Sequence, residues 1–131
     1  MPEGGDLGKI PLDCVVYRAV KLINLKPDGT PQSGCFSDLA DADGSKDYMS
    51  VYFADEMAAN GVSVKDLAAH WGERYAIVEF TVADLVTEGE AVWRDPDGKF
   101  PGHGACKRAD GLKRTVGQKR RIAKLARRSD A

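Results

Sequence analysis

Apolar and polar residues alternate over residues 48–53 and 75–82, as they do in strands with one buried face. A run of β-branched and aromatic residues over 13–20 predicts a strand before them. Shorter runs over 90–94 and 103–108 predict two more strands, the second at an edge of the sheet. The pattern therefore indicates a sheet built from several short strands.

Helix-capping residues lie between the predicted strands. Ser63 with Asp66, and Thr81 with Asp84, have the spacing of a capping box, in which each side chain bonds the backbone of the other residue. Each of these helices is expected to end at the next glycine, because glycine readily adopts the left-handed conformation that closes a helix. A third short helix is expected over residues 54–61.

The clearest helical pattern begins at Thr115, which has capping spacing with Gln118. At 100° per residue, apolar residues fall on one side of this helix and basic residues on the other. The expected basic face consists of Arg120, Arg121, Lys124, Arg127 and Arg128. The apolar side is expected to join a core of Val51, Phe53, Val78, Phe80, Ile122 and Leu125.

These elements predict a single α+β domain over residues 13–131, with a small mixed or antiparallel sheet, three or four short helices, and the C-terminal amphipathic helix packed on the sheet. The chain has 131 residues, 43% hydrophobic and 30% charged, which suits one globular domain.

Residues 1–12 are expected to form a flexible tail. They lack the pattern of a signal peptide, so a cytoplasmic protein is expected. No apolar run approaches the roughly 20 residues of a membrane-spanning helix, and no membrane contact is expected.

The net charge of −1 results from two parts of opposite sign. Residues 1–106 contain 9 basic and 18 acidic residues, whereas residues 107–131 contain 10 basic and 2 acidic residues. Such a separation favours either an acidic partner for the C-terminal helix or an electrostatic match within the chain.

Cysteine usage argues against two kinds of structural site. Cys14, Cys35 and Cys106 are odd in number and widely spaced, which does not fit a disulfide framework. His103 and Cys106 have the spacing of half a zinc site, but structural zinc sites usually bring two such pairs. Free thiols, no metal and no cofactor are therefore expected. A role for Cys106 as a nucleophile beside His103 is also considered, but the residues around Cys106 do not match the signature of a cysteine hydrolase.

Two polar residues are candidates for chemistry because of where they lie. His103 lies between glycines, which let a backbone approach a ligand closely, and its imidazole titrates near neutral pH. The alternative is a turn histidine that bonds nearby backbone. Arg18 lies inside an apolar strand, where an unpaired charge is costly. It would either hold a phosphate or carboxylate, or pair with an acidic residue such as Glu79.

Ser50 is a third candidate because it shares a strand face with Tyr48 and Tyr52. That face would either line a nucleotide pocket or be the exposed side of the sheet.

The order of several landmarks resembles a family of small bacterial proteins of similar length. The landmarks are Tyr17-Arg18, Phe36, Met49-Ser50-Val51, Asp95-Pro96 and Pro101-Gly102-His103, followed by the basic helix. The resemblance covers most of the chain and implies a bacterial-type origin but no particular activity. The order of Arg18, Ser50 and Glu56 is also similar to that of NAD-consuming transferases of the ADP-ribosylating kind, which would imply a nucleotide-like substrate.

Two functions of different classes follow. The favoured one is an interaction or accessory module whose basic C-terminal helix binds nucleic acid or an acidic partner. The alternative is a small enzyme acting on a nucleotide-like substrate, in which Arg18 holds the anion, His103 transfers a proton and Ser50 lines the pocket. The enzyme hypothesis requires Arg18 and His103 to face one cavity.

Overall fold

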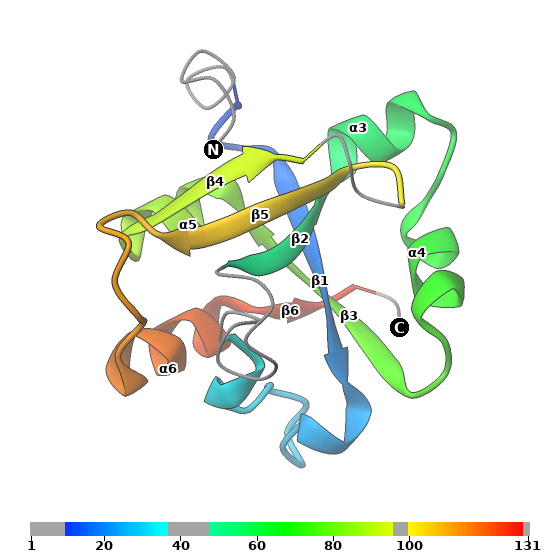
Figure 1. Ribbon diagram of the computed structural model, residues 1–131. Helices are drawn as coiled ribbons and strands as arrows, with labels where there is room; N and C mark the ends of the chain where they lie inside the picture. The colour runs from blue at the N-terminus through cyan, green and yellow to red at the C-terminus, as the bar shows by residue number, and fades with distance from the viewer. Residues whose placement is uncertain (1–9, 37–47, 96–99, 130–131) are drawn as a thin grey trace.

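The computed structural model describes residues 10–36, 48–95 and 100–129 of the chain. They form a six-stranded sheet whose neighbouring strands are all antiparallel, in the order β4-β5-β2-β1-β3-β6 (Figure 1). The strands are β1 (Val15–Lys21), β2 (Met49–Phe53), β3 (Tyr75–Thr81), β4 (Glu90–Arg94), β5 (His103–Arg108) and β6 (Arg127–Arg128). The predicted α+β class is confirmed, and of the two predicted sheet types the antiparallel one is found.

Helices pack on both sides of this sheet (Figure 1). One side carries α3 and α4, and the other carries α5, α6 and the 3-10 turn η2, while a second turn, η1, follows β1. Their bounds are η1 (Leu22–Asn24), η2 (Ser33–Phe36), α3 (Ala54–Ala59), α4 (Val64–Trp71), α5 (Val82–Thr87) and α6 (Val116–Leu125). None of the helices in the described ranges is long and apolar enough to cross a membrane.

Strand alternation sends neighbouring residues to opposite sides of the sheet. On β1, Val16 pairs with Phe53 and Phe80 and packs in the core beneath α6. The next residue, Tyr17, pairs with Tyr52 and Glu79 and lies on the side of α4. We call these two sides the α6 face and the α4 face.

The predicted core lies on the α6 face. Five of its six residues are almost fully buried there, namely Val51, Phe53, Val78, Phe80 and Ile122. Leu125 is only partly buried, because α6 ends at this residue. The core also includes Ile10. The rest of the predicted tail up to that residue, residues 1–9, lies outside the described residues.

All three predicted helix caps are present. Ser63 and Thr81 each form a capping box with the aspartate three residues later. Thr115 accepts a hydrogen bond from the N–H of Gln118, whose own side chain bonds to the start of β4 instead of completing the box. These caps use only local backbone groups, so the local sequence is enough to predict them.

Two predictions about the edges of the sheet are wrong. β5 lies between β4 and β2 instead of at an edge. The C-terminal helix ends at Leu125, and Arg127 and Arg128 form strand β6 instead of extending the helical basic face. Pairing with β3 explains this change. Without β6, β3 would be an edge strand with unpaired backbone groups, and β6 satisfies them.

A polar cluster is buried within the α6 face, and we call it the Glu90 cluster: Glu90, Cys106, Arg114 and Gln118. Glu90 Oε1 accepts hydrogen bonds from Arg114 Nε at 2.9 Å and from the Cys106 thiol at 3.1 Å. Glu90 Oε2 accepts one from Gln118 Nε2 at 2.8 Å. Arg114 also donates to the carbonyls of Phe36 and Cys106. The cluster therefore joins η2, β4, β5 and α6.

The three cysteines are buried free thiols, as the sequence predicts. Burial raises the pKa of the Cys106 thiol well above its usual value of 9.0, and the nearby Glu90 carboxylate raises it further. The native thiol therefore stays neutral at pH values where an unfolded thiol ionises.

Replacing Ile122 should test how α6 is attached. Ile122 is fully buried, so Ile122→Ala should lower the free energy of unfolding by about 2–5 kcal/mol. Leu125→Ala should cost clearly less, because Leu125 is only partly buried. Urea unfolding of both variants is the measurement. Equal losses would contradict the packing described for α6.

The buried Cys106 thiol should make the protein less stable at alkaline pH. A group whose pKa is raised by folding stabilises the native state below its unfolded pKa, and this stabilisation is lost as the pH rises above that value. For one thiol with an unfolded pKa of 9.0, the loss should reach about 1.4 kcal/mol between about pH 8 and about pH 10. Urea unfolding should show a shallower alkaline decline for Cys106→Ala, and parallel pH curves for the two proteins would refute the assignment.

Candidate functional site

The predicted basic residues are all exposed, and we call them the basic segment: Arg120, Arg121, Lys124, Arg127 and Arg128. The first three lie on α6 and the last two on β6. Arg121 Nε lies 2.7 Å from Glu88 Oε1, so part of its charge is balanced within the chain. The segment therefore presents its cations from a helix and an edge strand, where the sequence predicts one helical face.

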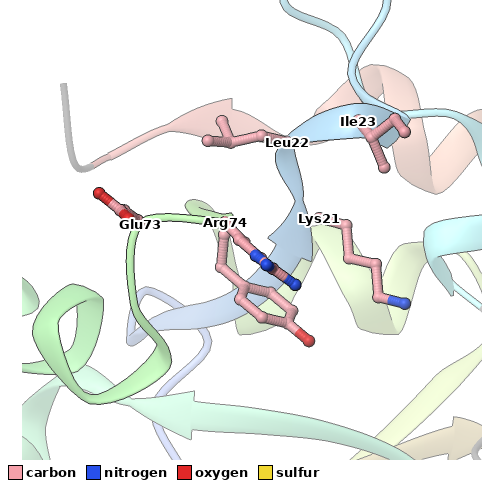
Figure 2. Close-up of a pocket in the computed structure, with 6 residues that line it drawn as sticks. Lys21, Leu22, Ile23, Glu73 and Arg74 are labelled. Atoms are coloured by element: carbon pink, nitrogen blue, oxygen red, sulfur yellow. The ribbon is translucent and has the colours of Figure 1, made fainter.

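A hollow of about 570 Å³ lies where β1 leads into η1 beside the start of β3 (Figure 2). We call it the basic hollow, and its walls are Lys21, Leu22, Ile23, Glu73, Arg74 and Tyr75. Lys21 pairs with Tyr75 across the two strands, and the Leu22 N–H donates to the Arg74 carbonyl at 2.9 Å. These backbone contacts bring Lys21 and Arg74 to the same opening from positions 53 apart in the sequence.

The charge of the basic hollow is positive. Figure 2 shows the Arg74 guanidinium directed toward the side of Lys21, whereas the Glu73 carboxylate points away from both. Within the described part of the chain, neither Lys21 nor Arg74 has a side-chain ion pair. Two unneutralised cations beside one opening favour an anionic ligand.

The basic hollow adjoins the basic segment. A second hollow of about 590 Å³ shares the walls Leu22, Glu73 and Tyr75 and is also lined by Arg128. Arg128 therefore lies on the far side of the wall that bounds Lys21 and Arg74. The sequence does not reveal this position of Arg128, because it depends on how β6 pairs with β3.

Two of the predicted chemical residues, Ser50 and His103, meet on the α4 face. Ser50 Oγ lies 3.2 Å from His103 Nε2. The other ring nitrogen, Nδ1, lies 3.1 Å from Asp95 Oδ2. Asp95, His103 and Ser50 therefore form a row of carboxylate, imidazole and hydroxyl, which we call the α4-face triad.

The triad is positioned by the sheet. His103 pairs with Tyr52, and Ser50 pairs with Ala105, so the two side chains lie diagonally across β2 and β5. The Asp95 N–H donates to the His103 carbonyl at 3.0 Å, which extends the β4–β5 ladder by one residue. Tyr52 packs its ring edge-to-face with the imidazole at a centroid distance of 5.5 Å. Backbone pairing thus fixes all three residues.

The glycines around His103 serve packing, whereas the sequence hypothesis has them approach a ligand. A Cβ on Gly104 would overlap the ring of Phe53 and lie 2.7 Å from the Trp93 carbonyl. Gly102 has φ +89°, and its Cβ would lie 2.7 Å from the side chain of Met57. Both positions are occupied by the protein itself, so they leave no space for an anion.

Arg18 is the predicted site residue that does not join the others. It is one residue after Tyr17, so its side chain lies on the α6 face with Val78 as its strand partner, opposite His103. The prediction that Arg18 and His103 face one cavity is therefore wrong. Strand alternation is the physical reason. Tyr17 shares a face with Tyr52 and His103, so its neighbour Arg18 lies on the opposite face.

Arg18 instead bonds to backbone carbonyls. Its Nε donates to Cys35 at 2.9 Å and its Nη1 donates to Ser50 at 2.7 Å. The pairing with Glu79 is also wrong, because Glu79 lies across from Tyr17 on the α4 face. Burial, and secondarily the charge of Arg114, lower the pKa of Arg18 to about 10, so it stays protonated at neutral pH. It fixes the backbone of Ser50 from beneath.

Other predicted residues fall outside the triad. Glu56 lies 3.6 Å from Arg94 as part of an ion pair, away from Arg18. Cys106 and His103 are three positions apart on β5 and so lie on opposite faces, which separates the two candidate zinc ligands. Asp95 completes the triad, and the only sequence signal for it is the position of Asp95-Pro96 at the end of a predicted strand.

Comparisons of the chain with protein-family models, with curated proteins and with solved structures found no match. The resemblance to small bacterial proteins stays a prediction. The function of the basic hollow and of the α4-face triad is therefore inferred from their geometry.

Substituting Gly104 should destabilise the sheet beneath the triad. A methyl group there would collide with a ring atom of Phe53 and a backbone carbonyl, so Gly104→Ala should cost about 1–3 kcal/mol of unfolding free energy. Gly34→Ala is the control, because its Cβ would meet nothing within 4 Å. Chemical denaturation compares the two, and a Gly104→Ala variant as stable as the control would contradict the close packing.

Proposed function

We propose that this protein binds single-stranded nucleic acid along a basic surface that runs from the basic segment into the basic hollow. The observation that carries the proposal is the shared wall of Leu22, Glu73 and Tyr75. Arg128 lies on one side of it, and Lys21 and Arg74 lie on the other. Cations on both sides of one wall suit a backbone with a negative charge at every nucleotide.

Apolar side chains next to these cations favour nucleic acid over an acidic protein. Ile23 is 84% exposed, and Tyr75 is a half-buried aromatic wall of the basic hollow. Single strands bind to grooves that combine basic side chains for phosphates with aromatic or apolar surfaces for bases. An acidic peptide would use the cations and leave Ile23 uncovered.

The net charge of −1 is compatible with this proposal because the charges are separated. The acidic excess lies in residues 1–106, while the basic segment lies in residues 107–131. Local fields around such a cluster steer anionic ligands even when the total charge is close to zero. The enzyme hypothesis that combines Arg18 with His103 is not proposed, because these side chains lie on opposite faces of the sheet.

Removing the two cations of the basic hollow should weaken binding in a salt-dependent way. For Lys21→Gln/Arg74→Gln, the slope of log affinity against log salt should become shallower by about 1.4, or about 0.7 for each phosphate that the variant no longer neutralises. Fluorescence anisotropy with a labelled oligonucleotide, at several salt concentrations, measures this slope. The fold should be unchanged, because both side chains are on the surface.

The matched control is Lys65→Gln/Lys113→Gln, which removes two exposed lysines that line neither hollow. It should keep the slope of the unmodified protein. An equal change in both double variants would reduce the effect to total charge and contradict the proposed surface. Binding of polyglutamate but not of single-stranded DNA or RNA at low salt would replace nucleic acid with an acidic protein.

A further inference from the structure

The α4-face triad takes no part in the proposed nucleic-acid surface and has the components of an activated serine. We propose that Ser50 is a nucleophile, with His103 as its general base and Asp95 as the carboxylate that orients the imidazole. Its substrates would be activated acyl groups such as esters. Nucleophile, base and orienting acid are recognised by their mutual geometry, because the same arrangement occurs in unrelated folds.

The distances define a direction for the proton. A carboxylate beside Nδ1 favours the tautomer that carries its proton on Nδ1, so that Nε2 is the unprotonated nitrogen and accepts from the Ser50 hydroxyl. The 3.2 Å between Ser50 Oγ and His103 Nε2 is at the upper end of hydrogen-bond reach. Hydrogen bonds of catalytic groups are often long or misaligned without substrate and tighten when it binds.

The surroundings of the triad hold its members in place. Ser50 is fixed through its carbonyl by Arg18, and His103 is held between the ladders of β2 and β4. Gly104 lets Phe53 pack directly beneath β5, so the strand that carries His103 has little freedom to shift. Preorganisation of this kind lowers the entropy cost of reaching a reactive geometry.

The members of the triad differ in their exposure to solvent. The imidazole is 10% exposed and the Asp95 carboxylate 25% exposed, while Ser50 is half-buried. The base is thus the most shielded of the three, while Ser50 and Asp95 are each partly open to solvent. Trp93 lies in the same cross-strand row as Ser50, separated from it by Ala105, and contacts Tyr48 edge-to-face at 6.1 Å. These rings favour an apolar acyl group.

The proposed reaction has two steps. Ser50 Oγ attacks the ester carbonyl carbon while its proton moves to His103 Nε2, and the bond to the leaving alcohol then breaks as His103 returns that proton to the alcohol oxygen. Water then attacks the acyl-serine through the same base, which releases the acid and restores Ser50. The only co-reactant is water.

Labelling with a fluorophosphonate tests the proposal, because activated serines form a P–O bond with this probe as fluoride leaves. Mass spectrometry of the full chain should find one label, on Ser50. The label should disappear in Ser50→Ala and persist in Ser33→Ala, a control on η2. His103→Gln should slow labelling by about 100-fold or more, since general bases contribute at least that much. Asp95→Asn should slow it by about tenfold or more.

The pH dependence separates catalysis from a structural role. Labelling of the unmodified protein should become faster as the pH rises through the titration of His103, because only the neutral imidazole accepts a proton. In His103→Gln this rise should vanish while circular dichroism stays unchanged. Asp95 lies beyond the end of β4 and is partly exposed, so Asp95→Asn provides a second variant if His103→Gln unfolds.

Three results would overturn the proposal. One is the absence of label on Ser50 at millimolar probe. Another is an unchanged labelling rate in folded His103→Gln or folded Asp95→Asn. The third is a rate that does not depend on pH across the histidine range. None of these results involves the basic surface, so the nucleic-acid proposal stands or fails separately.

Discussion

The carboxylate of Glu90 and the guanidinium of Arg114 form an ion pair that is 0% and 1% exposed. A charge in such a place is tolerated only when its hydrogen-bonding capacity is filled, and removing one partner leaves the other charge uncompensated. The pair meets this condition through Gln118, Cys106 and the carbonyl of Phe36. Because these groups come from β4, β5, α6 and η2, four elements of the α6 face depend on the same two charges.

This arrangement separates the two faces of the sheet by role. The α6 face also contains Arg18, a half-buried cation whose pKa is lowered by desolvation and by the charge of Arg114. Within the described residues, its hydrogen bonds go to carbonyls. The polar side chains of the α6 face named here therefore form hydrogen bonds within the protein. On the α4 face, helices cover the region of β1 and β3. The polar row of Asp95, His103 and Ser50 lies just past the end of β4 and on β5 and β2. The two faces meet at Ser50, whose carbonyl serves one and whose hydroxyl serves the other.

The sequence predicts features that depend on neighbouring residues and misses those that depend on strand register. The caps at Ser63, Thr81 and Thr115 are local, and the strand alternation identifies the buried residues of β2 and β3. Whether Arg18 and His103 share a face depends on which strands lie between them, and no local pattern encodes that. Asp95 is missed for the same reason, since only the pairing of β4 with β5 brings it to His103. Lys21 and Arg74 meet through the β1–β3 register. The end of α6 is also missed. No glycine or proline marks it in the sequence, and the helix ends where β6 pairs with β3.

The Glu90–Arg114 pair also constrains the order in which the chain can fold during synthesis. Strands β1 to β5 are all made before residue 114, and domains generally fold as units while the chain emerges. Until Arg114 leaves the ribosome, however, Glu90 is a carboxylate with no counter-charge, and closing the α6 face over it would be strongly unfavourable. Until then, the apolar α6 face of the first five strands lacks the cation that its buried carboxylate requires. Closure of the α6 face therefore depends on Arg114, which the chain supplies only after five of the six strands.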